Sequence, residues 1–163
     1  MKAKLFCFTV LFFTGFQVFS QQEKIVKLLN KQLNRELKQY TYDDSLKVLH
    51  SFVIDKNKVL SLEVKKYDMY NSEWRIVKQE VPLDKITGFI KDVNVIFETE
   101  PDAVTVTVQK FSEAGVLLNK DTSKYHLFLT EICKDQDNES FRDKIVQAFE
   151  KTGYAIESQV WAD

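Results

Sequence analysis

The chain offers few side chains that could carry catalysis or hold a metal. His50 and His126 are its two histidines, and Cys133 is its only cysteine beyond residue 20. Nucleophilic catalysis needs a serine or cysteine beside a base, and a zinc site needs three or four converging ligands. No His-x-x-x-His, Cys-x-x-Cys or Gly-x-Ser-x-Gly spacing is present. The sequence therefore predicts a non-enzymatic protein with no catalytic residue, no metal site and no cofactor.

The acidic segment 135–139 is the remaining candidate for a metal site. It contains Asp135, Asp137 and Glu139. A calcium loop needs several oxygen ligands at fixed offsets and a glycine at its tight turn, and this segment has no glycine. We interpret it as the polar approach to a helix.

A cluster of aromatic residues and methionine suggests a binding surface. Tyr67, Met69, Tyr70 and Trp74 lie in and beside a predicted loop. Such side chains are enriched where proteins meet their partners. These four are the predicted binding residues, although the same cluster could instead cap one end of a sheet.

The segment 74–108 indicates the kind of sheet that would carry this cluster. Three strand-like runs are separated at 81–86 and 99–102, and each break contains a proline. In the third run, Val104, Val106 and Val108 alternate with polar residues, as in a strand with one buried face. Similar runs before and after predict antiparallel strands over residues 46–130. In this interpretation 112–123 is mainly a loop, and 125–129 is one strand that completes the sheet.

A helix is predicted at each end of this sheet. Residues 21–40 carry apolar side chains at spacings of three and four, which gives one apolar stripe. Residues 140–152 carry a second stripe, with Ser140 as the expected N-cap and Gly153 as the stop. The predicted fold is α+β: a curved antiparallel sheet or small barrel of about six to seven strands, with an N-terminal helix and a C-terminal capping helix.

The first 20 residues have the pattern of a secretory signal peptide. Lys2 and Lys4 precede an apolar run at 5–19, and cleavage is expected after Ser20. The run is short of the ~20 residues that span a bilayer, which disfavours the alternative of a membrane anchor. We therefore expect export to the periplasm or secretion, a single domain over 21–163, and no transmembrane anchor in the mature chain.

Charge and cysteine content limit the partners and the means of stabilisation. Without Lys2 and Lys4 the 23 basic residues fall to 21 against 24 acidic ones, a net charge of −3. This balance gives no attraction to nucleic acid. With Cys133 alone after cleavage, no intramolecular disulfide can form, so burial of apolar side chains must hold the fold.

Residues 59–152 resemble bacterial pleckstrin-homology-like domains. The resemblance depends on the strand that ends in Val-Pro-Leu-Asp-Lys-Ile at 81–86, the two hairpins after it, and the closing helix with Ala148 and Phe149. It implies a small barrel whose C-terminal helix plugs one open end. The long N-terminal helix departs from that pattern, so no ligand site is carried over. A cystatin-like fold would explain the first helix better but would leave the last helix unexplained.

These observations leave two classes of function. The first is an exported module that binds a protein, a peptide or an envelope component. The alternative is a carrier of a small apolar ligand in a cavity of the curved sheet. The two differ in what fills the concave face of the sheet, which is packed side chains in a binding module and empty volume in a carrier.

Overall fold

A computed structural model describes residues 2–40, 45–136 and 138–162 of the 163-residue chain. Most of the polar turn expected at 41–45 and Asp137 of the acidic segment lie outside these residues. The described part contains two α-helices, eight strands and one 3₁₀ turn. All strand pairs within its two sheets are antiparallel. The predicted α+β class, with antiparallel strands between two terminal helices, is confirmed.

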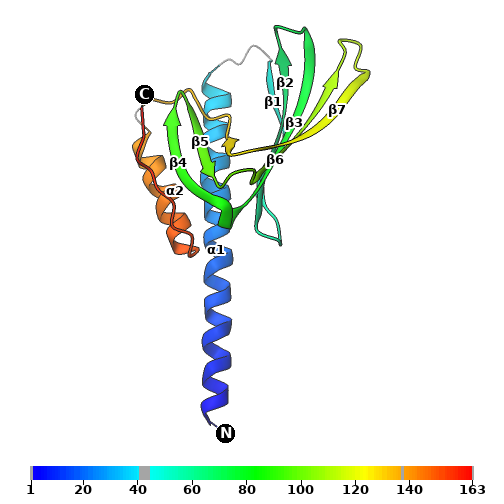
Figure 1. The fold of residues 1–163 in the computed structure, drawn as a ribbon. Coiled ribbons are helices and arrows are strands. Elements are labelled where there is room, and N and C mark those ends of the chain that lie inside the picture. The colour runs from blue at the N-terminus through cyan, green and yellow to red at the C-terminus, as the bar shows by residue number, and fades with distance from the viewer. Residues whose placement is uncertain (1, 41–44, 137, 163) are drawn as a thin grey trace.

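Helix α1 spans Lys2–Gln39 and passes without a break through the expected cleavage position. Its C-terminal half buries Ile25, Leu29 and Leu33, which are spaced by four residues and so share one face. Figure 1 shows the N-terminal part of α1 extending away from the sheets. Within the described residues, no helix combines the length and the apolar character needed to cross a membrane.

The larger sheet has the strand order β1-β2-β3-β6-β7. Its members are β1 (Leu46–Ile54), β2 (Val59–Asp68), β3 (Glu73–Pro82), β6 (Val104–Phe111) and β7 (Leu117–Tyr125). Side chains alternate between the two faces, and one face enters the core through Leu60, Leu62, Val64, Val81 and Val104. The other face bears Trp74, Ile76 and Phe111, all partly exposed. We call this second face the outer face.

The smaller sheet contains β4 (Ile86–Asp92), β5 (Asn94–Thr99) and β8 (Leu127–Leu129), in the order β4-β5-β8. The 3₁₀ turn Leu83–Lys85 leads from the larger sheet into β4. The buried Gln79 amide joins the two sheets: it donates to the Leu129 carbonyl at 2.8 Å and accepts from the Leu129 N–H at 3.0 Å. One side chain thus replaces a pair of backbone hydrogen bonds between β3 and β8.

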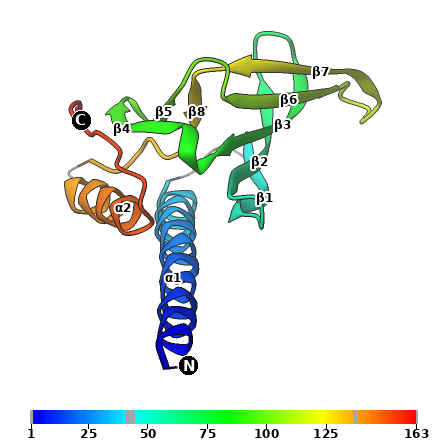
Figure 2. The ribbon, with the colours of Figure 1, turned by 60° about the horizontal axis from the view of Figure 1, so that its bottom comes forward.

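Helix α2 (Glu139–Lys151) closes the core beside α1 and the smaller sheet (Figures 1 and 2). Aromatic rings fill the space beneath it. Phe97 lies 5.5 Å from Phe149 and 4.7 Å from Phe89, and Phe89 meets Phe141 edge-on at 5.8 Å, measured between ring centroids. Gly153, with φ +86°, ends the helix as expected.

The number and grouping of strands differ from the prediction. The described residues form eight strands in two open sheets, whereas about six to seven in one sheet or barrel were expected. The segment 112–123, expected to be mainly loop, contains most of β7, which pairs with β6 along its length. Every residue of β7 is exposed, so backbone pairing holds this edge strand without a buried periodic pattern.

Two local predictions are also wrong. The strand expected at 125–129 is divided at His126, because Tyr125 pairs with Val104 in the larger sheet and Leu127 pairs with Glu98 in the smaller one. The N-cap of α2 is Asn138, not Ser140. The Asn138 side chain makes no capping bond, because its oxygen accepts from the Trp161 indole N–H at 2.9 Å.

Candidate functional site

The four predicted binding residues lie at the turn that joins β2 to β3. Tyr67 and Trp74 are directly paired across the two strands, and their ring centroids are 5.2 Å apart. Met69 is 80% exposed and Tyr70 is fully exposed in the turn between them. Two aromatic rings therefore support a turn that presents two large side chains to solvent.

Trp74 also carries a cation on its ring. The Lys65 ammonium lies 4.5 Å from the ring centroid, within the range of a cation–π interaction. Lys65 pairs with Ile76 in the register of β2 and β3, so both lie on the outer face with Tyr67 and Trp74. This part of the face combines apolar area with one positive charge.

The turn itself is fixed by Asp68. Its carboxylate accepts from the Asn71 side-chain amide at 2.9 Å and from the Tyr70 N–H at 2.9 Å, and it pairs with Arg75. The Asn71 side chain contributes most to holding the pKa of Asp68 below its ordinary value, followed by the backbone N–H groups and Arg75. Asp68 therefore remains charged at neutral pH, and its contacts connect both sides of the Met69–Tyr70 turn.

A second segment, outside the predicted binding residues, completes this surface. Trp74 pairs with Phe111, the last residue of β6, so the β6–β7 turn lies at the same end of the sheet as the β2–β3 turn. Val116, Leu117 and Leu118 at that turn are 60%, 51% and 59% exposed. We call the two turns with Tyr67, Trp74 and Phe111 the distal surface; its exposed residues are Met69, Tyr70, Val116, Leu117 and Leu118.

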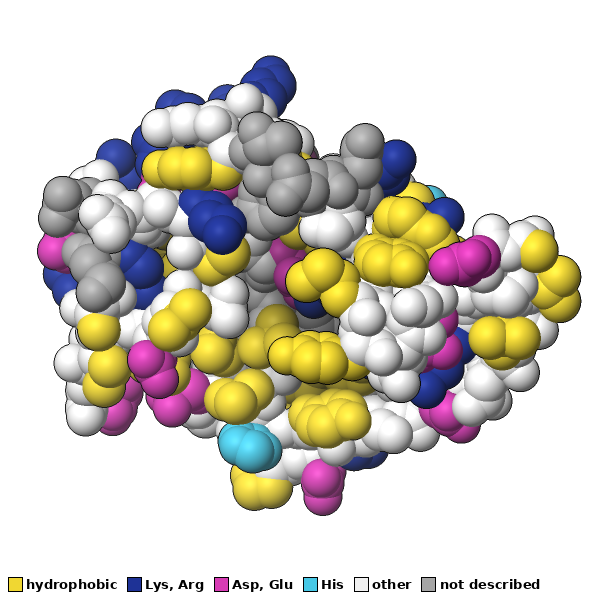
Figure 3. Space-filling view, turned by 90° about the horizontal axis from the view of Figure 1, so that it is seen from above, with side chains coloured by type: hydrophobic (Ala, Val, Ile, Leu, Met, Phe, Trp, Pro, Cys, Tyr) yellow, Lys and Arg dark blue, Asp and Glu magenta, His cyan; other side chains and the backbone are white. Residues whose placement is uncertain are grey.

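The distal surface contains a pocket of about 300 Å³. It is lined by Lys65, Trp74, Ile76, Phe111, Ser112, Glu113 and Gly115. This volume is at the lower end of the range for ligand pockets, ~300–1,000 Å³, and suits one large side chain. Figure 3 shows hydrophobic side chains, interleaved with charged ones, on the end of the molecule toward which both turns point.

The histidines and the cysteine lie on different elements. His50 is exposed on β1, and its Nδ1 lies 2.9 Å from a Glu63 carboxylate oxygen. His126 is exposed between β7 and β8, and Cys133 follows β8. Among the described residues, no group of three or more histidine, cysteine, aspartate or glutamate side chains is placed to hold a metal ion.

A buried polar cluster joins α1 to the segment after β8. Glu36 is fully buried; its carboxylate accepts from the backbone N–H groups of Cys133 and Lys134, both at 2.8 Å, and of Asp135 at 3.3 Å. The Gln32 side-chain amide bridges the carboxylates of Glu36 and Asp135, donating to Glu36 at 3.0 Å and to Asp135 at 2.6 Å.

Charged groups surround Asp135. Its carboxylate pairs with Arg35, and the buried Lys91 ammonium donates to its backbone carbonyl at 2.9 Å. Asp135, the first residue of the acidic segment 135–139, therefore joins the segment after β8 to α1. No spacing in the sequence indicated this cluster, because about a hundred residues separate its two halves.

Comparison with protein-family models, with curated proteins and with solved structures gives no match. The resemblance to pleckstrin-homology-like domains stays a prediction.

Proposed function

We propose that this protein is an exported, non-enzymatic binding module that recognises a protein or peptide segment through its distal surface. The juxtaposition of the β2–β3 and β6–β7 turns around the Trp74 pocket is the observation that supports this proposal. Exposed apolar side chains that gather at one place, instead of lying singly, are typical of interaction sites.

The distal surface has the composition expected of a small recognition site. Trp74, Tyr67 and Phe111 form a rigid aromatic base, because each is anchored in a strand. Met69 and Tyr70 are the exposed side chains of the β2–β3 turn, at the same end of the sheet as the pocket, and are available to contact a bound segment. Aromatic anchors around a partly dry pocket contribute most of the affinity in many interfaces.

The ligand favoured by these walls is a segment with one aromatic or large aliphatic side chain. Lys65 and Glu113 at the pocket offer polar contacts of both signs at its edge. The free edge of β7 is a less suitable site for adding a strand, since Lys120 and Lys124 are charged side chains on that edge, where lysine commonly prevents pairing.

The packing of the interior bears on the alternative function. A carrier needs empty volume between helix and sheet, and here that space is occupied by Phe89, Phe97, Phe128 and Phe149, each fully buried. This packing favours binding at the surface over carriage of an apolar ligand inside the molecule.

The test uses peptides selected from a randomised display library against the full chain. Binding is followed by the fluorescence of Trp74 in a Trp161→Phe background, which removes the only other tryptophan. We expect selected peptides to carry an aromatic or large aliphatic residue and to shift this fluorescence. Replacing both Met69 and Tyr70 by serine should weaken binding by roughly tenfold or more.

The matched control is Val53→Ser, which removes a 49%-exposed apolar side chain from β1. The proposal is wrong if the Met69/Tyr70 double variant and the Val53 variant bind the selected peptides equally well. Export is tested separately: mass spectrometry of protein from the envelope or the medium should find a chain that begins at Gln21.

A further inference from the structure

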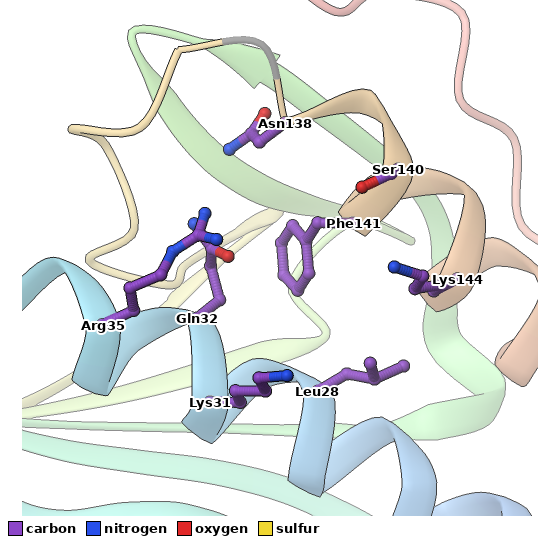
Figure 4. A pocket seen from close by; sticks show the side chains of 8 residues that line it. All are labelled: Leu28, Lys31, Gln32, Arg35, Asn138, Ser140, Phe141 and Lys144. Atoms are coloured by element: carbon purple, nitrogen blue, oxygen red, sulfur yellow. The ribbon is translucent and has the colours of Figure 1, made fainter.

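A second pocket lies between α1 and the first turn of α2 (Figure 4), and it shares no lining residue with the pocket of the distal surface. It is lined by Leu28, Lys31, Gln32, Arg35, Asn138, Ser140, Phe141 and Lys144, and its volume is about 160 Å³. A cavity of ~150 Å³ can hold a molecule the size of benzene, so the pocket accepts a small ligand. Its described lining contains three cationic side chains and no carboxylate.

Two of these cations have no counter-ion in the described part of the chain. Lys31 and Lys144 are exposed and form no ion pair with a described carboxylate, whereas Arg35 is paired with Asp135. Figure 4 shows Lys31 on α1 and Lys144 on α2 on opposite sides of the opening. Two ammonium groups so placed attract an anion and are drawn together by it.

Asn138 provides an independent indication of a ligand. Its side chain is only 4% exposed, and its oxygen accepts from Trp161. Because an indole N–H can only donate, this bond fixes which end of the amide faces Trp161. The amide nitrogen is buried at the pocket and has no hydrogen-bond partner among the described residues. Figure 4 shows it directed toward the side where Gln32 and Arg35 lie.

A buried donor without an acceptor costs free energy, and an oxyanion in the pocket would remove that cost. The same anion would lie near the N-terminus of α2, a helix of 13 residues whose partial positive charge favours negative groups. The Ser140 hydroxyl, in the first turn, is a further donor at the pocket.

We propose that this pocket binds the phosphate group of a small organic phosphate monoester. A phosphate monoester carries nearly two negative charges and three acceptor oxygens. These match the ammonium groups of Lys31 and Lys144 and the donors Asn138 and Ser140. Leu28 and Phe141 form the apolar part of the wall and contact the carbon skeleton of the ester.

The experiment is isothermal titration calorimetry of the full chain with two probes, ethyl phosphate and inorganic phosphate. We expect both to bind saturably, with ethyl phosphate the tighter because its alkyl group contacts the apolar wall. Lys31→Ala and Lys144→Ala should each weaken binding by roughly tenfold, the order expected for a lost charge-assisted hydrogen bond.

Asn138→Asp is the most specific variant. An aspartate still accepts from Trp161, but it removes the amide donor and adds a negative charge, so binding should be abolished. Lys151→Ala, at the other end of α2, is the control and should bind as the unchanged protein does. Melting curves establish whether each variant is folded. If Asn138→Asp is not folded, the comparison of Lys144→Ala with Lys151→Ala tests the proposal.

Three outcomes overturn the proposal. The first is no saturable binding of either probe by the unchanged protein. The second is equal affinity in the Lys144→Ala and Lys151→Ala variants. The third is tighter binding of inorganic phosphate than of ethyl phosphate, which would refute an organic ester. The site is independent of the distal surface, so Trp74→Ala should leave the affinity for both probes unchanged.

Discussion

Replacing Glu36 by glutamine should destabilise the protein strongly, although the two side chains have nearly the same shape. The Glu36 carboxylate is fully buried, and one of its oxygens accepts two backbone N–H bonds at 2.8 Å from Cys133 and Lys134. The other oxygen accepts from Gln32 at 3.0 Å and from Asp135 at 3.3 Å. All four neighbours are donors, so the NH₂ group of a glutamine must face a donor whichever way the amide is turned.

The magnitude follows from these bonds. A hydrogen bond to a charged acceptor contributes ~1.5–3 kcal/mol and a neutral one ~0.5–1.5, so each of the two short backbone bonds loses about 1 kcal/mol. A buried N–H left facing the amide NH₂ costs a further ~1–3 kcal/mol. Relief of repulsion between Glu36 and Asp135 offsets part of this loss. The expected decrease in the free energy of unfolding is about 3 kcal/mol, a large part of the ~5–15 kcal/mol of an ordinary domain.

The assay is urea unfolding followed by far-UV circular dichroism. With a slope of ~2 kcal/mol per molar urea, the midpoint should fall by about 1.5 M. Glu23→Gln is the matched control, because Glu23 is exposed on the same helix and its change should stay within ~0.5 kcal/mol. Equal midpoints for the two variants would show that Glu36 does not hold α1 to the segment after β8.

Two further predictions concern the core and the distal surface. Phe149→Ala should lower the free energy of unfolding by ~3–5 kcal/mol, since Phe149 is fully buried against Phe97; a urea midpoint no lower than that of Lys151→Ala would contradict this. NMR titration should place the Asp68 pKa below the ordinary 3.8, and Asn71→Ala should raise it toward that value. Because the folded-state pKa is lowered, this stabilisation of the turn is present above the unfolded-state pKa and is lost as the pH falls through the folded-state pKa. An Asp68 pKa that Asn71→Ala leaves unchanged would refute the assigned cause.

Local patterns in the sequence were sufficient to predict most of the elements. The spacing of Ile25, Leu29 and Leu33 predicted the packed part of α1, and alternation around Val104 predicted β6. Such patterns work because a buried face repeats with the period of the element itself. The aromatic cluster at Tyr67 could also be identified from the sequence, because its members are close together along the chain.

Strand β7 and the division into two sheets were decided by tertiary structure. Every residue of β7 is exposed, so no apolar period marks it. Its pairing with β6 consists mainly of backbone hydrogen bonds, which nearly any sequence can make, with side-chain bonds between Thr107 and Thr122 and from Lys124 to Thr105. At His126 the chain passes from the larger sheet to the smaller one, because Tyr125 pairs with β6 and Leu127 pairs with β5. No local pattern in the sequence predicts these partners.

The functional surfaces follow the same division. The sequence by itself indicated the β2–β3 turn as a binding surface. Only the register of β3 with β6 places Phe111 beside Trp74 and brings the β6–β7 turn to the same end of the sheet. The second pocket depends wholly on the packing of α1 against α2, which brings Lys31 and Lys144 to one opening across more than a hundred residues of chain. Contacts within one element are determined by the periodicity of the sequence, whereas contacts between elements are determined by how the buried faces of the whole chain fit together.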